Sequence, residues 1–119
     1  MKCIGVQSET CQHAPVQLAT VSNRDREQAA AMFRALGDPA RLLVMELLSQ
    51  GELCVSELAL LTGQEISTIS QRLKVLRAER LIARRRDGKH IYYALADKHV
   101  MDLVRSALEH AGEHNTEEP

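Results

Sequence analysis

The chain has 119 residues, 45% of them hydrophobic but only 3% aromatic, and a net charge of −1 at pH 7, which fits one compact domain with an aliphatic core. No apolar run approaches the roughly 20 residues of a membrane span, no signal peptide is recognisable, and 3 cysteines are too few for a disulfide framework. We therefore expect a cytoplasmic protein without a membrane partner, whose cysteines are free thiols or metal ligands.

The N-terminal third of the chain reads as an arm followed by two helices. Residues 1–23 are polar and lack periodicity, which predicts a flexible arm. Apolar residues at spacings of three and four then predict a helix over residues 24–36, and Gly37 ends it. Asp38 and Pro39 predict the start of a second helix, because aspartate is a favoured N-cap and proline is tolerated in the first turn.

The middle of the chain predicts two further helices separated by a tight turn. The third helix is expected at about residues 56–62, ended by Gly63, and the fourth at about residues 65–80. The fourth helix carries an apolar stripe that we expect to face inward: Ile66, Ile69, Leu73 and Leu76. Helix, glycine turn and helix together outline a helix-turn-helix motif.

A β-hairpin is predicted directly after the fourth helix. Residues 81–86 and 89–95 are expected to form its two strands, because the dipeptide Asp87-Gly88 between them favours a tight turn. A hairpin in this position, with arginines on its strand and Lys89 at its tip, makes a winged helix. The expected fold class is therefore mainly α with a small β-hairpin, a winged helix-turn-helix.

Positive charge is concentrated in the fourth helix and the hairpin. Residues 71–90 hold eight basic and two acidic residues, a local charge of +6, which leaves −7 on the rest of the chain. A basic block on an acidic body indicates a polyanionic partner, although a solvated charged surface would have the same composition.

The last predicted helix, over residues 97–114, carries four candidate metal ligands in two pairs: Asp97 with His99, and His110 with Glu113. Eleven residues turn a helix by about 1100°, so the two histidines share a face. They also lie about 16 Å apart along the axis, whereas metal–nitrogen bonds are about 2 Å long, so one ion cannot reach both. The alternative is a helix whose ends are decorated with solvated polar residues.

Five segments resemble the ArsR/SmtB family of metal-sensing winged-helix repressors: ALGDPARLLVMELL, GELCVSEL, ISTISQRLKVLRAERLI, RRRDGKHIYYAL and DKHVMDLVRSALEHAGEH. The pattern D-x-H-x10-H-x2-E in the last segment resembles the interfacial zinc site of the SmtB branch. Gln64 and Glu65 depart from the family, which usually has a hydrophobic residue and a serine-type N-cap there. We expect a DNA-binding and dimerisation domain over residues 24–114 and a frayed tail over residues 115–119.

The resemblance implies a homodimer with two identical metal sites. Antiparallel packing of two last helices would bring Asp97 and His99 of one chain beside His110 and Glu113 of the other. Two imidazoles and two carboxylates suit tetrahedral zinc or cobalt and disfavour soft ions. In the family, the histidine at the position of His110 passes a hydrogen bond to a carbonyl near the end of the recognition helix, here around Arg80.

A second metal site is implied around Cys54 on the third helix. Cys54 and Glu57 are separated by three residues, and Cys11 with His13 forms a Cys-x-His pair on the arm that reaches the partner's third helix in relatives. Cys3 is an alternative arm ligand. A thiolate-rich set favours cadmium, lead or zinc. The alternative is that Cys54 is a small buried hydrophobic residue and Cys11 an idle thiol.

The resemblance also places DNA contacts on the fourth helix and the hairpin. The helix residues expected at DNA are Ser67, Thr68, Ser70, Gln71 and Arg72. Serine, threonine and glutamine can read base edges, whereas arginine can bind phosphate or guanine. On the wing, we expect Arg84, Arg86 and Lys89 to contact phosphates or the minor groove of a double-stranded operator with an inverted repeat.

The function predicted from the sequence is that of a metal-responsive repressor, released from its operator by zinc, or by cadmium, lead or cobalt. A repressor of the same fold that senses thiol oxidation through Cys11 and Cys54 is the main alternative. A zinc hydrolase is disfavoured, because four protein ligands leave no position for a substrate. A metal-buffering protein would not need the basic block. We therefore expect no enzymatic activity and no small organic substrate.

Overall fold

The computed structural model of the protein describes residues 14–16 and 20–116. The arm ligands predicted from the sequence, Cys3, Cys11 and His13, lie outside these residues. Five helices and three strands follow one another in the order α1 (Asn23–Leu36), α2 (Pro39–Leu48), β1 (Leu53–Cys54), α3 (Val55–Thr62), α4 (Ile66–Ala78), β2 (Ile82–Asp87), β3 (His90–Leu95) and α5 (Lys98–Thr116).

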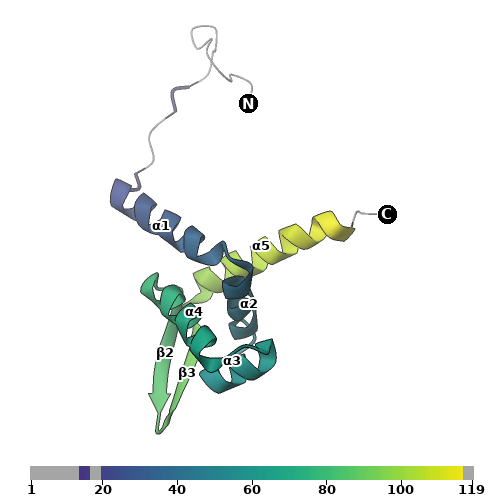
Figure 1. Ribbon diagram of the computed structural model, residues 1–119. Coiled ribbons are helices and arrows are strands. Elements are labelled where there is room, and N and C mark those ends of the chain that lie inside the picture. Colours follow the sequence, from purple (N-terminus) through teal and green to yellow (C-terminus); the bar gives the residue numbers. More distant parts are fainter. Residues whose placement is uncertain (1–13, 17–19, 117–119) are drawn as a thin grey trace.

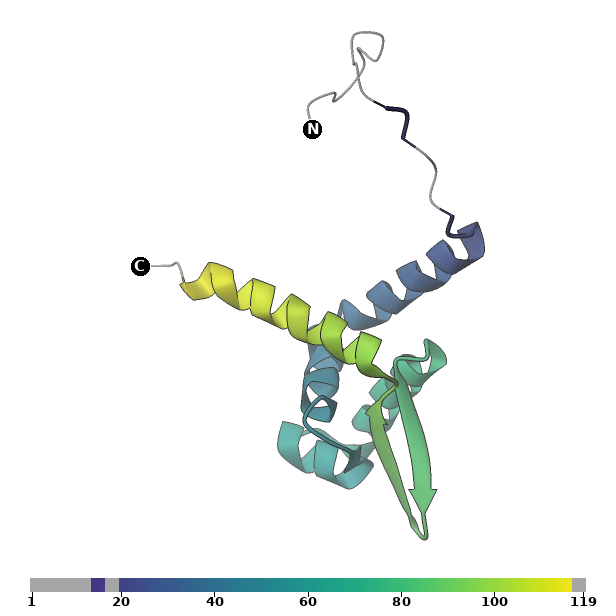
Figure 2. The ribbon, with the colours of Figure 1, turned by 180° about the vertical axis from the view of Figure 1, so that it is seen from behind.

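The helices α2, α3, α4 and the β2–β3 hairpin form a winged-helix body, from which α1 and the C-terminal half of α5 extend in different directions (Figures 1 and 2). This confirms the predicted fold class. Among the helices of the described residues, none is long and apolar enough to cross a membrane.

Local capping signals begin α2 and α5 and end α3 where the sequence predicted. The side chain of Asp38 accepts a hydrogen bond of 3.0 Å from the Arg41 N–H, and Pro39 occupies the first turn of α2. Gly63 ends α3 with a φ of 69°, a left-handed conformation that favours glycine. Asp97 Oδ1 accepts from the Val100 N–H at 3.1 Å and thereby caps α5.

The recognition helix α4 ends two residues earlier than expected, in a Schellman turn built without glycine. Arg80 takes the left-handed position with a φ of 59°, and its N–H donates to the Arg77 carbonyl at 3.0 Å. The Leu81 N–H donates to the Leu76 carbonyl at 3.1 Å, and both leucine side chains are fully buried. Both leucines belong to the hydrophobic core, so burial of residues on either side of the turn accompanies the helix end.

The sheet has three antiparallel strands in the order β1-β3-β2, one more strand than the hairpin predicted from the sequence. The strand β1 has only two residues, too few to show an alternating pattern. Asp87 pairs with His90, so the two residues of the hairpin turn are Gly88 and Lys89. Of these two residues only Gly88 has a positive φ, and a positive φ at the first turn position is what a type II′ turn requires.

The core lies between α2, α4, the base of the hairpin and the first half of α5. Fully or almost fully buried side chains include Met45, Leu58, Ile69, Leu73, Leu76, Leu81 and Val104. This confirms the inward position of Ile69, Leu73 and Leu76, and Tyr93 on the hairpin is buried as well. The prediction for Ile66 was wrong: it opens α4, one turn before the packed part of the helix, and its side chain is 56% exposed.

Candidate nucleic-acid interface and metal half-sites

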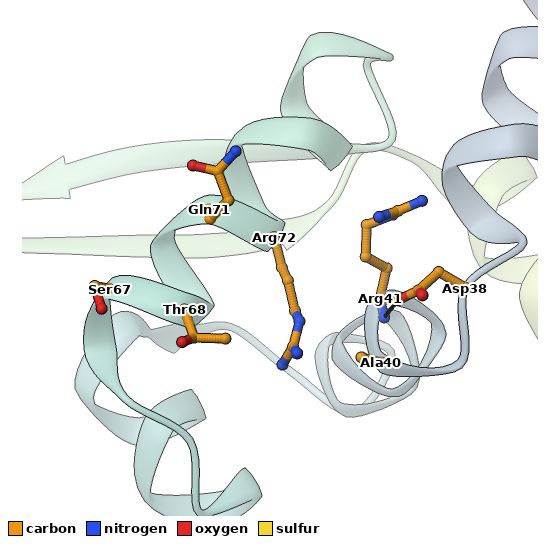
Figure 3. A pocket seen from close by; sticks show the side chains of 7 residues that line it. All are labelled: Asp38, Ala40, Arg41, Ser67, Thr68, Gln71 and Arg72. Atoms are coloured by element: carbon orange, nitrogen blue, oxygen red, sulfur yellow. Dashed lines mark hydrogen bonds between the residues drawn. The ribbon is translucent and has the colours of Figure 1, made fainter.

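The first turns of α4 present a polar surface beside the N-terminus of α2. Ser67, Ser70 and Gln71 are exposed and Thr68 is half-buried, as expected for residues that read base edges. Several of them line an open groove of about 530 Å³ between the two helices (Figure 3). Ile66, which the apolar spacing predicted to face inward, also lies in the first turn of α4, and its exposed side chain adds an apolar group that can contact a thymine methyl.

Arg72 lies differently from its neighbours on α4. Figure 3 shows its side chain running toward α2, whereas Gln71 points away from that helix. Within the described part of the chain, the Arg72 guanidinium makes no hydrogen bond or ion pair, while the nearby Arg41 donates to the Ala35 carbonyl at 2.7 Å. Of the two partners that the sequence left open for Arg72, this position favours a phosphate over a guanine.

The wing presents Arg84 and Arg86 on one face of the hairpin. Alternate residues of a strand share a face, and Arg84 pairs with Tyr93 while Arg86 pairs with Ile91. Ile82 and Tyr93 on the same face are buried in the core, so this face is the one that packs against the body. Both arginines are exposed beyond the edge of the core, and Lys89 is exposed at the turn.

Arg85 lies on the opposite face of the hairpin and is bound to Glu52. Its Nη2 lies 2.7 Å from Glu52 Oε1, and its Nε donates to Oε2 at 2.9 Å. These hydrogen bonds hold the pKa of Glu52 below its ordinary value and raise that of Arg85. Because the Glu52 pKa is depressed, the interaction is fully present at neutral pH and is lost only as the pH falls through that lowered value.

The two candidate ligand pairs on α5 are each already assembled. His99 Nδ1 lies 3.6 Å from Asp97 Oδ1, and His110 Nδ1 lies 3.6 Å from Glu113 Oε1. Two ligand atoms on one tetrahedral zinc ion lie about 3.3 Å apart, given bonds of about 2 Å. Each pair therefore fits half of a tetrahedral site, with little movement needed.

One chain does not bring the two pairs together. In the part of the chain that the structure describes, no group of three or more His, Cys, Asp or Glu side chains could hold a metal. All four side chains are largely exposed, from 57% for Asp97 to 95% for His99. The pairs are thus two separate candidate half-sites, both exposed on the outside of the chain.

Cys54 is the N-cap of α3 rather than a residue within the helix. Its N–H donates to Glu57 Oε1 at 2.9 Å, which places that carboxylate beside the cysteine. The thiol is free and half-buried, and it is the one cysteine among the described residues. The geometry brings Cys54 and Glu57 together, while their predicted arm partners fall outside the described residues.

An apolar groove of about 190 Å³ separates α1 from α5. It is lined by Phe33, Leu42, Leu103 and Ala107 among others, and the Phe33 side chain is 59% exposed. Exposed apolar surface of this kind marks a site of protein contact.

A helix-turn-helix with a polar recognition face, followed by a wing that carries exposed arginines, defines a winged-helix DNA-binding regulator. Residues 38–84 match the family described as bacterial regulatory protein, arsR family. A transcriptional repressor SmtB homolog from Synechocystis sp. is 43% identical over 98 residues, which are 82% of this chain and 74% of the relative. A cadmium resistance transcriptional regulatory protein CadC homolog from Staphylococcus aureus is 38% identical over 85 residues, which are 71% of this chain and 70% of that relative.

A solved structure with the same fold is the homodimeric winged helix-turn-helix DNA-binding domain of Mb0332 from Mycobacterium bovis. It superposes with a TM-score of 0.75 at 33% identity, over 85% of this chain and 96% of that one. The chain therefore belongs to the ArsR/SmtB family of transcriptional regulators and is not an enzyme.

Proposed function

We propose that this protein is a homodimeric, zinc-responsive transcriptional repressor that binds operator DNA without metal and leaves it when zinc binds. The observation that carries the proposal is the pair of half-sites on α5, each with ligand atoms 3.6 Å apart and open to the outside. A second copy of the same helix, antiparallel to the first, supplies the missing half of each site. The protein acts in the cytoplasm, where its operator is.

The dimer is supported by the exposed surfaces of α1 and α5. The C-terminal half of α5 extends away from the body in Figures 1 and 2, and the apolar groove between the two helices contains Phe33 and Leu103. Packing against a partner would bury these side chains and complete two identical metal sites related by a two-fold axis. The relative Mb0332 is described as homodimeric.

The donor set favours zinc or cobalt at the α5 site. Two imidazole nitrogens and two carboxylate oxygens match tetrahedral borderline ions better than soft ions. Cys54 with Glu57, joined by Cys11 and His13 or by Cys3, forms a second site that takes cadmium, lead or zinc. A relative is named for cadmium resistance, which supports metal response in this part of the family.

The route from metal to DNA runs through His110. When its Nδ1 binds metal, the ring is neutral and the remaining N–H requires an acceptor. We propose that this acceptor is the backbone carbonyl of Arg80, the left-handed residue that ends α4. The contact would favour a dimer geometry in which the two recognition helices no longer fit successive major grooves.

The direct test is operator binding by the full-length protein with and without zinc, cadmium and copper. The duplex is one that the metal-free wild type selects from a random-sequence pool. We expect an inverted repeat with half-sites about one helical turn apart. Release by zinc and retention with copper support the proposal. Release by peroxide but not by zinc would transfer the sensing role to the thiols of Cys11 and Cys54.

A first prediction separates phosphate contacts from base contacts. Arg86→Ala should weaken binding to all sequences alike and flatten the dependence of log K on log salt by about 0.9, the loss of one phosphate contact. Gln71→Ala should instead change which sequences are preferred, because its amide reads a base edge. Selection and salt titration of both variants provide the measurement. An equal, sequence-independent loss in both would remove Gln71 from the base-reading set.

A second prediction separates the two metal sites. Cys54→Ser should abolish thiolate-to-metal absorption with cadmium or cobalt, since Cys54 is the thiol next to Glu57. Zinc release of the operator should persist, because the α5 ligands are unchanged. Absorption titrations and operator binding are measured on the same sample. Loss of the zinc response in this variant would assign regulation to the Cys54 site.

A further inference from the structure

The hairpin is fastened to the body by a side-chain bridge that spans all three strands. Arg85 on the outer strand β2 reaches Glu52, which directly precedes β1 on the other edge of the sheet. The strand β3 lies between these two edges, and the guanidinium carbon of Arg85 lies 4.9 Å from the centre of the Tyr92 ring on β3. Arginine thus contributes a two-point hydrogen bond to a carboxylate and a cation–π contact.

The bridge lies where the three-stranded sheet ends and the free wing begins. The pairs Leu53–Tyr93 and Cys54–Tyr92 are the whole of the β1–β3 ladder, and Arg85 pairs with Tyr92 from the other side. Beyond this row, the hairpin is a two-stranded ribbon that carries Arg86 and Lys89. A two-stranded hairpin alone is only marginally stable in water, so its direction depends on what holds its base.

Charge alone would give Arg85 the same role as its neighbours on β2, but its contacts give it a different one. It belongs to the basic block, but its guanidinium is already bound to a carboxylate and turned to the face opposite Arg84 and Arg86. A phosphate contact by Arg85 would require breaking the bridge, whereas the other two arginines make no such bond within the described residues.

We propose that Arg85 and Glu52 are positioning residues for DNA binding: their bridge across Tyr92 holds the wing at the angle at which Arg84 and Arg86 meet the DNA. This rests on the proposed DNA-binding function and adds to it an acidic residue that favours binding to a polyanion. Simple electrostatics predicts the opposite effect for Glu52, because a negative charge near DNA repels it.

Whether DNA binding becomes weaker or tighter when the charge of Glu52 is removed therefore tests the role of the bridge. In full-length protein, Glu52→Gln should weaken binding to the selected duplex roughly two- to five-fold, the range of one well-formed exposed ion pair. The matched control is Glu65→Gln at the N-cap of α4, where the side chain makes no capping hydrogen bond. This control should tighten binding, because it removes an acid near the DNA without breaking a bridge. Arg85→Lys keeps the charge but not the two-point contact, and should weaken binding like Glu52→Gln.

A double-mutant cycle distinguishes wing positioning from a general structural effect. In an Arg86→Ala background, Glu52→Gln should have a smaller effect, because the contact that the bridge positions is already absent. The positioning role of the bridge would be overturned if Glu52→Gln bound DNA as tightly as the wild type or more tightly. It would also be overturned if Glu52→Gln had an undiminished effect in the Arg86→Ala background. A wild-type protein that selects no duplex would instead count against the proposed function itself.

Discussion

A dimer carrying His110→Asn is expected to remain on its operator at zinc concentrations that release the wild-type protein. Zinc should lower the operator affinity of the wild type by about 5- to 150-fold, the range of a coupling energy of about 1–3 kcal/mol. An asparagine side chain can still bind the ion through its oxygen beside Glu113, but it has no second ring nitrogen to donate to the Arg80 carbonyl. We expect weaker zinc binding and little release even at saturation, measured by operator titration at increasing zinc.

The matched control is the same substitution at the other histidine of the site. His99→Asn replaces the imidazole ligand of the Asp97 pair with an amide oxygen but leaves the His110 ring. This variant should therefore bind zinc more weakly and yet release DNA once saturated. Reciprocity gives an independent measurement, because DNA should weaken zinc binding to the wild type by the same factor. If metal-saturated His110→Asn left the operator as readily as His99→Asn, the route through His110 would be excluded.

Leu76→Ala should lower the free energy of unfolding by about 2–5 kcal/mol, which is a large share of the stability of a domain of this size. Leu76 is fully buried and its carbonyl accepts the hydrogen bond that ends α4, while its side chain belongs to the same core cluster as that of Leu81. Truncation leaves a cavity under the recognition helix. Urea unfolding measures the effect, at one fixed protein concentration and without metal because both dimerisation and metal binding stabilise the folded chain.

Leu60→Ala provides the control for that experiment. Leu60 is the same residue type on the neighbouring helix α3, but its side chain is 84% exposed. Its truncation should change the free energy of unfolding by no more than about 0.5 kcal/mol. Equal losses at Leu60 and Leu76 would mean that the core does not extend under α4 as described.

Features that depend on neighbouring residues could be predicted from the sequence. Asp38 and Pro39 begin a helix and Gly63 ends one, because capping and left-handed turns involve only a few consecutive residues. The winged-helix outline followed from the same local signals. The spacing of His99 and His110 separates the candidate ligands into two pairs by helix geometry alone, and in the structure the members of each pair lie together while the two pairs lie apart.

Other features depend on residues that are distant in the sequence, and no local pattern indicates them. Arg72 and Gln71 are consecutive polar residues that both line the groove, but only the side chain of Arg72 runs toward α2. Ile66 has the spacing of a core residue, and its exposure follows from its place before the packed part of α4.

The sequence by itself determined the order of the helices, the hairpin, the basic wing and the two ligand pairs, because periodicity, capping and charge are local properties of the chain. Only the tertiary structure decided that Arg85 is bound to Glu52, 33 residues away, rather than presented to DNA beside Arg84 and Arg86. The physical reason is the strand order β1-β3-β2. Because β3 lies between the two edge strands, Glu52, which directly precedes β1, faces Arg85 on β2 across β3. Sequence spacing predicts that two strands joined by a tight turn are neighbours, but it does not predict that β1 pairs with β3 across the intervening α3 and α4.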